Sequence, residues 1–135
     1  MASGAIERFR LPDLLPEPIS HYTDAVRAGE TLWVSGLMAV APDGTIVGGD
    51  DAVAQTERIF EILAEILTRA AATFADVVKV TVYLRHMSDR VAINAVRRRY
   101  FGDARPASTL VEVSALASPA ALVEIDAFVH VPVGR

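Results

Sequence analysis

The chain has 135 residues, a formal net charge of −4 and no cysteine. This length fits one domain with a single core, which we take as residues 1–135. The acidic balance argues against a nucleic-acid surface, and the lack of cysteine excludes disulfides, a thiolate nucleophile and a cysteine metal site. Because no run of 18 apolar residues and no signal-like amino terminus is present, we expect a cytoplasmic protein without a membrane partner.

The first half of the chain predicts an irregular start, a buried strand and a long helix. Several prolines interrupt the first 18 residues. Residues 31–40 are apolar and β-branched, which favours a buried strand, and Gly36 marks a point where another group can approach the backbone closely. After a Pro-Asp-Gly turn, Asp50 or Asp51 can cap a helix that runs to about Thr73.

The second half predicts a strand, a shorter helix and two closing strands. Residues 77–84 alternate between apolar and polar, and Ser88 or Asp89 can cap a helix to about Phe101. The chain ends with strands at about 107–113 and 121–131. This order indicates an α+β fold, a mixed sheet with both helices on one face, and the other face needs cover, which favours oligomerisation.

Glu124 is the strongest candidate for chemistry. It shares one face of its strand with Leu122, while the alternate positions from Val123 to Val131 are apolar. A carboxylate on a largely buried strand must find hydrogen-bond donors or shift its pKa, and either suits a group that holds a water for hydrolysis. The other interpretation is an exposed carboxylate on a half-solvated face, which is the commoner case on the residues alone.

Two closing segments carry a resemblance to a known family. Residues 105–113 read Arg-Pro-Ala-Ser-Thr-Leu-Val-Glu-Val, and residues 121–127 read Ala-Leu-Val-Glu-Ile-Asp-Ala. They resemble the last two strands of the YjgF/YER057c/UK114 (RidA) family of enamine/imine deaminases. Further matching motifs extend the resemblance over about residues 17–132. It implies the chorismate-mutase-like α+β fold, assembled as a homotrimer with a pocket at each subunit interface.

The resemblance also implies roles for several residues. Glu124 matches the family glutamate that positions the attacking water. Tyr22 matches a tyrosine that closes over the pocket, and Ser35 with Gly36 matches the start of a Ser-Gly-Gln motif whose Gln is Leu37 here. Without the family, Ser35 reads as an ordinary strand serine.

Two more positions are substrate-binding candidates with open alternatives. Asn94 matches an Asn near the family's pocket, and it is otherwise a plain residue of a helix surface. His21 stands in the loop where the family has Gly-Pro. It is either a titratable neighbour of the pocket or a solvated loop histidine.

Ser108 is where this chain departs from the family. The matching residue is an Arg that grips the substrate carboxylate with a planar pair of donors, which Ser cannot reproduce. Either the substrate lacks that carboxylate or another cation binds it. Arg105 is the nearest candidate, although positions three apart on a strand do not share a face. Ser108, Thr109 and Arg105 are all kept as substrate-binding candidates.

The remaining charged residues predict no further site. Arg97, Arg98 and Arg99 spread over about 300° of a helix, so they indicate a solvated helix end and not an RNA surface. His86 and His130 lack partners at ligand spacing, so no metal site and no cofactor are expected.

The predicted function is cofactor-free hydrolysis of an enamine or imine with release of ammonia. The missing Arg favours a substrate other than small 2-imino acids, such as an aminomuconate-type compound. The alternative is a trimeric small-ligand-binding or regulatory protein that kept the pocket and lost catalysis.

Overall fold

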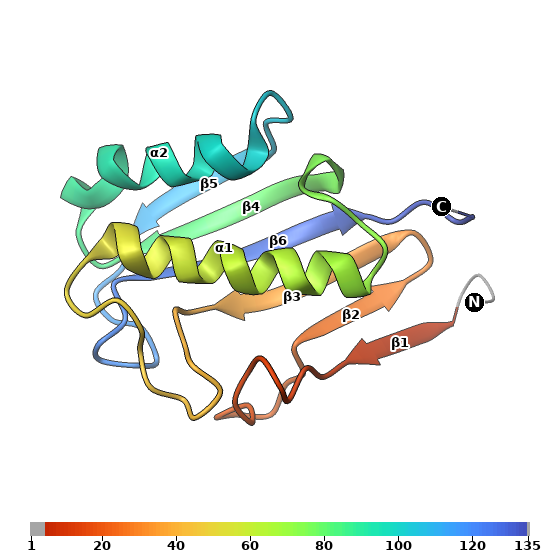
Figure 1. The fold of residues 1–135 in the computed structure, drawn as a ribbon, viewed down its shortest axis with the longest axis horizontal. Helices are drawn as coiled ribbons and strands as arrows, with labels where there is room; N and C mark the ends of the chain where they lie inside the picture. The colour runs from red at the N-terminus through yellow and green to blue at the C-terminus, as the bar shows by residue number, and fades with distance from the viewer. Residues whose placement is uncertain (1–4, 135) are drawn as a thin grey trace.

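A computed structural model describes residues 5–134, and it contains one six-stranded sheet with two α-helices (Figure 1). The strand order is β1-β2-β3-β6-β4-β5; β4 and β5 are parallel, and the other neighbours are antiparallel. The strands are β1 (Ile6–Phe9), β2 (Ala25–Ala28), β3 (Thr31–Leu37), β4 (Val77–Leu84), β5 (Ala107–Glu112) and β6 (Val123–His130). The helices are α1 (Ala52–Arg69) and α2 (Arg90–Phe101), with short 3₁₀ turns at Phe74–Asp76 and Met87–Asp89.

Both helices cover the same face of the sheet, as the sequence predicts (Figure 1). The reason lies in the alternation of β4 and β6. Val123, Ile125, Ala127 and Val129 of β6 are buried beneath the helices, and they pair with the buried residues of β4. The intervening residues of β6 point to the opposite side, which we call the open face.

The structure corrects several predicted boundaries and selects Asp51 from the two predicted caps of the first helix, which ends at Arg69 and not at about Thr73. The proline-rich start nevertheless contains β1 and pairs with β2, and neither strand was predicted. The third strand ends at Leu37, three residues before the predicted end. Asp51 caps α1, because its side chain accepts hydrogen bonds from the backbone N–H groups of Val53 and Ala54. Asp89 precedes α2, but its side chain makes no capping hydrogen bond.

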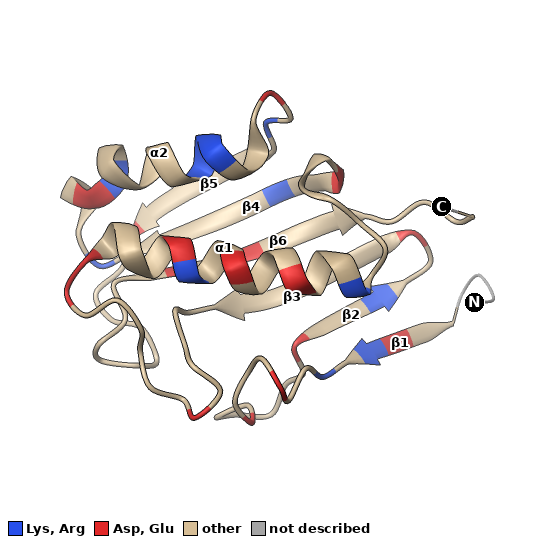
Figure 2. Ribbon diagram, in the orientation of Figure 1, with Lys and Arg blue, Asp and Glu red and all other residues tan. Residues whose placement is uncertain are grey.

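An aromatic cluster fixes α2 against α1. The rings of Phe60 on α1 and Tyr100 on α2 stack with centroids 5.1 Å apart, and Phe74 and Phe101 pack around them. Such pairs add about 0.5–1.5 kcal/mol beyond the burial of their area. Outward-facing charges of α1 lie on the solvent side of this layer (Figure 2). The cluster therefore sets the position of α2 over β5.

Buried Gln55 ties the segment before β6 to α1. Its side-chain amide nitrogen donates to the carbonyl oxygens of Gly49 and Ala120, and its oxygen accepts from the backbone N–H of Leu122 at 2.8 Å. This fully used amide explains how a polar side chain is accommodated in the core. It also fixes the chain two residues before Glu124.

The open face carries exposed apolar side chains in register. Val26, Trp33 and Phe128 are direct neighbours across β2, β3 and β6, and Trp33 and Phe128 are 43% and 44% exposed. Large apolar residues aligned on an uncovered sheet are typical of an interaction surface. Among residues 5–134, no helix is both long and apolar enough to cross a membrane.

Candidate active site

Glu124 lies against the backbone of Gly36, at an irregularity between β3 and β6. The pairing of these strands shifts between Val34 and Leu37, so the segment containing Gly36 bulges. A Cβ placed on Gly36 would stand 2.8 Å from Cδ of Glu124, closer than real Cβ atoms approach their neighbours. The predicted close approach at Gly36 is therefore confirmed, and the approaching group is the Glu124 carboxyl.

Two carboxylates of β6 share the open face but differ in their partners. Asp126 accepts hydrogen bonds from the Tyr83 hydroxyl at 3.1 Å and from the backbone N–H of Thr81 at 3.2 Å. Within residues 5–134, the half-buried Glu124 carboxylate has neither a hydrogen-bond donor nor a cation as partner. Glu124 is thus the carboxylate that is left free to hold a water.

The environment of Glu124 makes it a stronger base than an ordinary glutamate. Burial raises the pKa of its carboxyl, and the neighbouring charge of Asp126 adds to the rise. The pKa of Tyr83 is raised as well, first by burial and then by Asp126. A raised pKa lies closer to neutral pH, and a general base works best when its pKa is near the pH at which the enzyme operates.

A pocket of about 300 Å³ opens beside this carboxylate, and we call it the Glu124 pocket. It is lined by Ile19, Ser20, Tyr22, Ser35, Gly36, Met38, Ala117 and Glu124. The Ser35 hydroxyl donates to the Thr23 carbonyl oxygen at 2.6 Å, which fastens the loop that carries Tyr22 to β3. Ser35 therefore holds the wall of the pocket in place.

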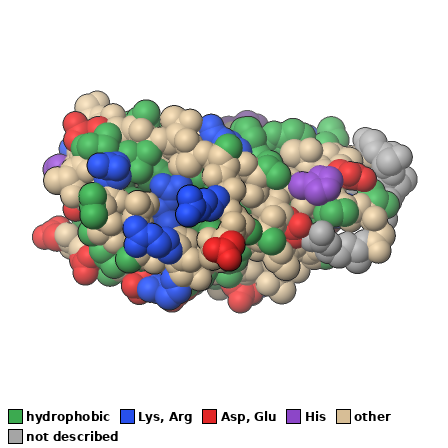
Figure 3. All heavy atoms as spheres, turned by 90° about the horizontal axis from the view of Figure 1, so that it is seen from above, with side chains coloured by type: hydrophobic (Ala, Val, Ile, Leu, Met, Phe, Trp, Pro, Cys, Tyr) green, Lys and Arg blue, Asp and Glu red, His purple; other side chains and the backbone are tan. Residues whose placement is uncertain are grey.

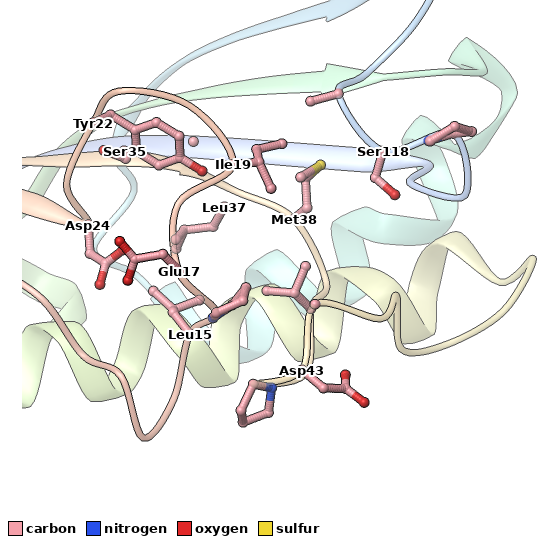
Figure 4. Close-up of a pocket in the computed structure, with 17 residues that line it drawn as sticks. Leu15, Glu17, Ile19, Tyr22, Asp24, Ser35, Leu37, Met38, Asp43 and Ser118 are labelled. Atoms are coloured by element: carbon pink, nitrogen blue, oxygen red, sulfur yellow. The ribbon is translucent and has the colours of Figure 1, made fainter.

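A larger, mainly apolar chamber of about 570 Å³ adjoins the Glu124 pocket. The two share six lining residues, including Tyr22, Ser35 and Met38. The Tyr22 ring lies beside Ser35, while Leu15, Ile19 and Leu37 surround the rest of the space (Figure 4). Leu37, with Leu15 and Ile19, makes this wall apolar.

A separate pocket of about 680 Å³ lies between α2 and the start of β5, and we call it the Arg97 pocket. Its lining consists of Asn94, Arg97, Arg98, Phe101, Gly102, Asp103, Arg105, Pro106 and Ser108. Nη2 of Arg97 donates to Oγ of Ser108 at 2.8 Å. Three guanidinium groups and one carboxylate give this pocket a positive balance.

The sheet separates the two pockets within one chain. Ser108 pairs with buried Val80 and contacts α2, so it lies on the helix side of the sheet. Glu124 pairs with Tyr83 and points to the open face. One chain therefore cannot place Glu124 and Ser108 around the same small substrate.

The predicted site residues thus fall into two groups with two outliers. Tyr22, Ser35, Gly36 and Glu124 line one pocket, whereas Asn94, Arg105 and Ser108 line the other. His21 is exposed and is not among the residues lining these pockets. Thr109 lies on the open face and accepts a hydrogen bond from Nζ of Lys79 at 3.0 Å.

The prediction of a solvated helix end does not hold for Arg97. Arg98 and Arg99 are exposed, as predicted for a solvated helix end, and Nη2 of Arg99 pairs with Glu57 at 3.4 Å. Arg97 is instead half-buried and turned toward β5. Its spacing from Asn94 was the available signal, because residues three apart share a helix face. Among residues 5–134, no group of three or more His, Asp or Glu side chains is arranged to hold a metal ion.

Comparison with known proteins identifies the family. The family model described as Endoribonuclease L-PSP matches residues 14–131. The chain belongs to the YjgF/RidA family. A RutC family protein of Pyrococcus abyssi is 40% identical over 116 residues, which cover 85% of this chain and 90% of the relative.

A second relative of this YjgF/RidA member has a named activity. The 3-aminoacrylate deaminase RutC of Acinetobacter baylyi is 36% identical over 121 residues, 90% of this chain and 95% of the relative. Among solved structures, a putative endoribonuclease of Thermotoga maritima superposes with a TM-score of 0.84 at 37% identity, covering 93% of this chain and 98% of that one. The fold expected from the sequence is confirmed, and the family includes a deaminase.

Proposed function

We propose that this protein hydrolyses an enamine or imine without a cofactor, in a homotrimer whose sites are shared between neighbouring subunits. The single observation that carries the proposal is the Glu124 carboxylate. It is half-buried, lacks a protein partner within residues 5–134 and lies against Gly36 in a pocket. A desolvated carboxylate without a partner suits a group whose partner is a bound water.

The reaction replaces a carbon–nitrogen double bond by a carbonyl. An enamine gains a proton at carbon and becomes an iminium, which is electrophilic. Glu124 takes a proton from the bound water as its oxygen adds to the iminium carbon. The same proton then passes to nitrogen. As ammonia leaves, Glu124 accepts the remaining hydroxyl proton, so that the carbonyl forms, and this proton is passed to the released ammonia as ammonium. The raised pKa of Glu124 suits these transfers, since its conjugate acid must return the proton.

The shared site follows from the two separated pockets. The open face bears Glu124 and also the exposed apolar residues Trp33 and Phe128. Covering this face with the Arg97 pocket of a neighbouring subunit buries those side chains. It also brings Asn94 and Ser108 to Glu124 from the second chain. The trimer and the active site therefore depend on the same contact.

The substrate is proposed to be larger than small 2-imino acids. Ser108 is shorter than the Arg that the family has there, and the pocket beside it measures about 680 Å³. The apolar chamber next to Tyr22 offers further space for a carbon chain. The ribonuclease label of some relatives is not carried over, because Arg97 and Arg99 turn to different elements and form no common cationic face.

A direct assay tests the proposal. Imines are generated in situ from several amino acids by an amino-acid oxidase, and ammonia release is followed with and without the protein. We expect clear acceleration for long-chain imines and little for the imine form of 2-aminoacrylate. If no imine or enamine is turned over while ligands still bind, the protein is the non-catalytic binding protein of the alternative hypothesis.

A further inference from the structure

One face of α2 presents a set of side chains to the beginning of β5. Asn94, Arg97 and Phe101 recur at three- and four-residue steps, and all three line the Arg97 pocket together with Ser108. The aromatic cluster around Phe60 fixes this helix, so the side chains are held in place. Lys and Arg side chains gather on the surface seen from above Figure 1, with an acidic side chain beside them (Figure 3).

Arg97 is a cation without an anion. Its guanidinium donates from Nη2 to the neutral hydroxyl of Ser108, and within residues 5–134 it forms no ion pair with a carboxylate. Burial lowers the pKa of Arg97 below its ordinary value, with no nearby acid to oppose the effect. Partial burial of a charge without a counter-charge costs free energy, because the charge has lost part of its hydration. Binding of an anion offsets this cost.

The neighbouring arginines are in different situations. Arg98 and Arg105 also line the pocket, but both are exposed to solvent. Arg99 faces the other helix and pairs with Glu57. Only Arg97, among the described arginines of this pocket, contacts Ser108 and is half-buried. The hydrogen bond to the Ser108 hydroxyl orients its guanidinium.

We propose that Arg97 binds a carboxylate group of the substrate in the Arg97 pocket. Arg97, on α2, would thus supply the positive charge that Ser108, on β5, lacks. The hydrogen bond to Ser108 uses one N–H of the guanidinium and orients the rest of the planar fork toward the pocket. A guanidinium held in this way matches the two oxygens of a carboxylate. This inference rests on the proposed function and narrows the substrate to a long imine or enamine that bears a carboxylate.

Binding of a simple carboxylate tests the inference without any turnover. Benzoate is titrated into the protein and compared with benzamide, which has the same shape and no charge, by calorimetry. We expect Arg97→Gln to weaken benzoate binding by about tenfold or more and to leave benzamide binding unchanged. Arg97→Lys, which keeps the charge and loses the fork, should fall between the two.

Matched variants show whether the effect is local. Arg98→Gln removes an adjacent charge from the same pocket, and we expect benzoate affinity within about twofold of wild type. Ser108→Arg in the Arg97→Gln background returns a cation to the strand and should restore benzoate binding. Mass in solution and thermal melting confirm that each variant keeps its fold and assembly.

Two results would overturn the inference. If Arg97→Gln does not change benzoate affinity, Arg97 is not the anchor. If Arg98→Gln weakens benzoate binding as much as Arg97→Gln does, the effect comes from the overall charge of the pocket and not from Arg97. Failure of the proposed deaminase is distinguishable. In that case no imine is turned over, yet benzoate affinity still depends on Arg97. Conversely, if imines are turned over but benzoate affinity does not depend on Arg97, the proposed function stands and only the proposed anchor is wrong.

Discussion

The Glu124 pocket and the Arg97 pocket are built from different kinds of scaffold. Glu124 stands on β6, which is paired on both sides, and Gly36 and the Gln55 hydrogen bonds fix the backbone around it. Arg97 stands on a helix above β5, which is an edge strand. The proposed base therefore stands on a central strand of the sheet, and the proposed anchor on a helix over its edge. We therefore expect substitutions of the proposed anchor to disturb the fold less than substitutions around the proposed base.

Removing the charge of Glu124 is the most severe test of this division. We expect Glu124→Gln to lower turnover by about 10²–10⁴-fold, because the group that takes the proton from water is lost. Substrate affinity should change far less, since anchoring belongs to the other pocket. Steady-state rates and calorimetric binding on the same preparation measure both. Turnover within twofold of wild type would remove Glu124 from the mechanism.

A methyl group on Gly36 should displace the Glu124 carboxyl from its position. Gly36→Ala puts Cβ into the Glu124 carboxyl, so we expect about 1–3 kcal/mol of destabilisation and about a 10²-fold loss of turnover. The control is the double variant Gly36→Ala with Glu124→Ala, in which the clash has been removed. If thermal melting shows equal destabilisation with and without the Glu124 side chain, the strain lies elsewhere in β3.

The acid limb of the pH–rate profile should report the ionisation of Glu124. Glu124 acts when ionised, so activity rises with pH through its pKa, which lies above the ordinary glutamate value. Asp126→Asn removes the neighbouring charge and should move this limb to lower pH. Glu65→Gln, at an exposed position of α1 on the other side of the sheet, is the control and should leave the limb in place. A limb that does not move would assign it to a group other than Glu124.

The smallest expected effect concerns stability. Because the pKa of Glu124 is higher in the folded protein than in the unfolded chain, its ionisation opposes folding. The stabilisation that its protonated form provides is complete below the unfolded pKa and is lost as pH rises through the folded pKa. We therefore expect Glu124→Gln to melt slightly above wild type at pH 7. The difference should shrink toward pH 4, and a variant that melts lower at pH 7 would contradict this.

The sequence predicted the parts of the molecule that follow a regular period. The two long strands and both helices show clear apolar spacing, and they carry most of the core. β1 and β2 were missed because each has four residues and they flank a proline-rich segment, so no period is visible. Gly36 was predicted as a point of close approach, although the approaching group could not be named from the strand alone.

The anchor was harder to predict because it depends on rotation and packing. Three consecutive arginines look alike in the sequence, and the direction of each depends on how α2 sits on β5. Arg105 was the expected substitute because it is near Ser108 along the chain, whereas Arg97 reaches Ser108 across the fold. Only the three-residue spacing between Asn94 and Arg97 pointed to the member of the run that contacts Ser108.

The placement of Ser108 and Glu124 on opposite sides of one sheet has a genetic consequence. If every site combines Glu124 of one subunit with Arg97 of the next, two differently disabled chains can rescue each other. In a ring that mixes Glu124→Gln and Arg97→Gln subunits, one of the three sites receives both native residues, so random assembly in equal amounts leaves about a quarter of all sites intact. Two alleles that each fail alone would then support activity together, which a site contained in one chain cannot do.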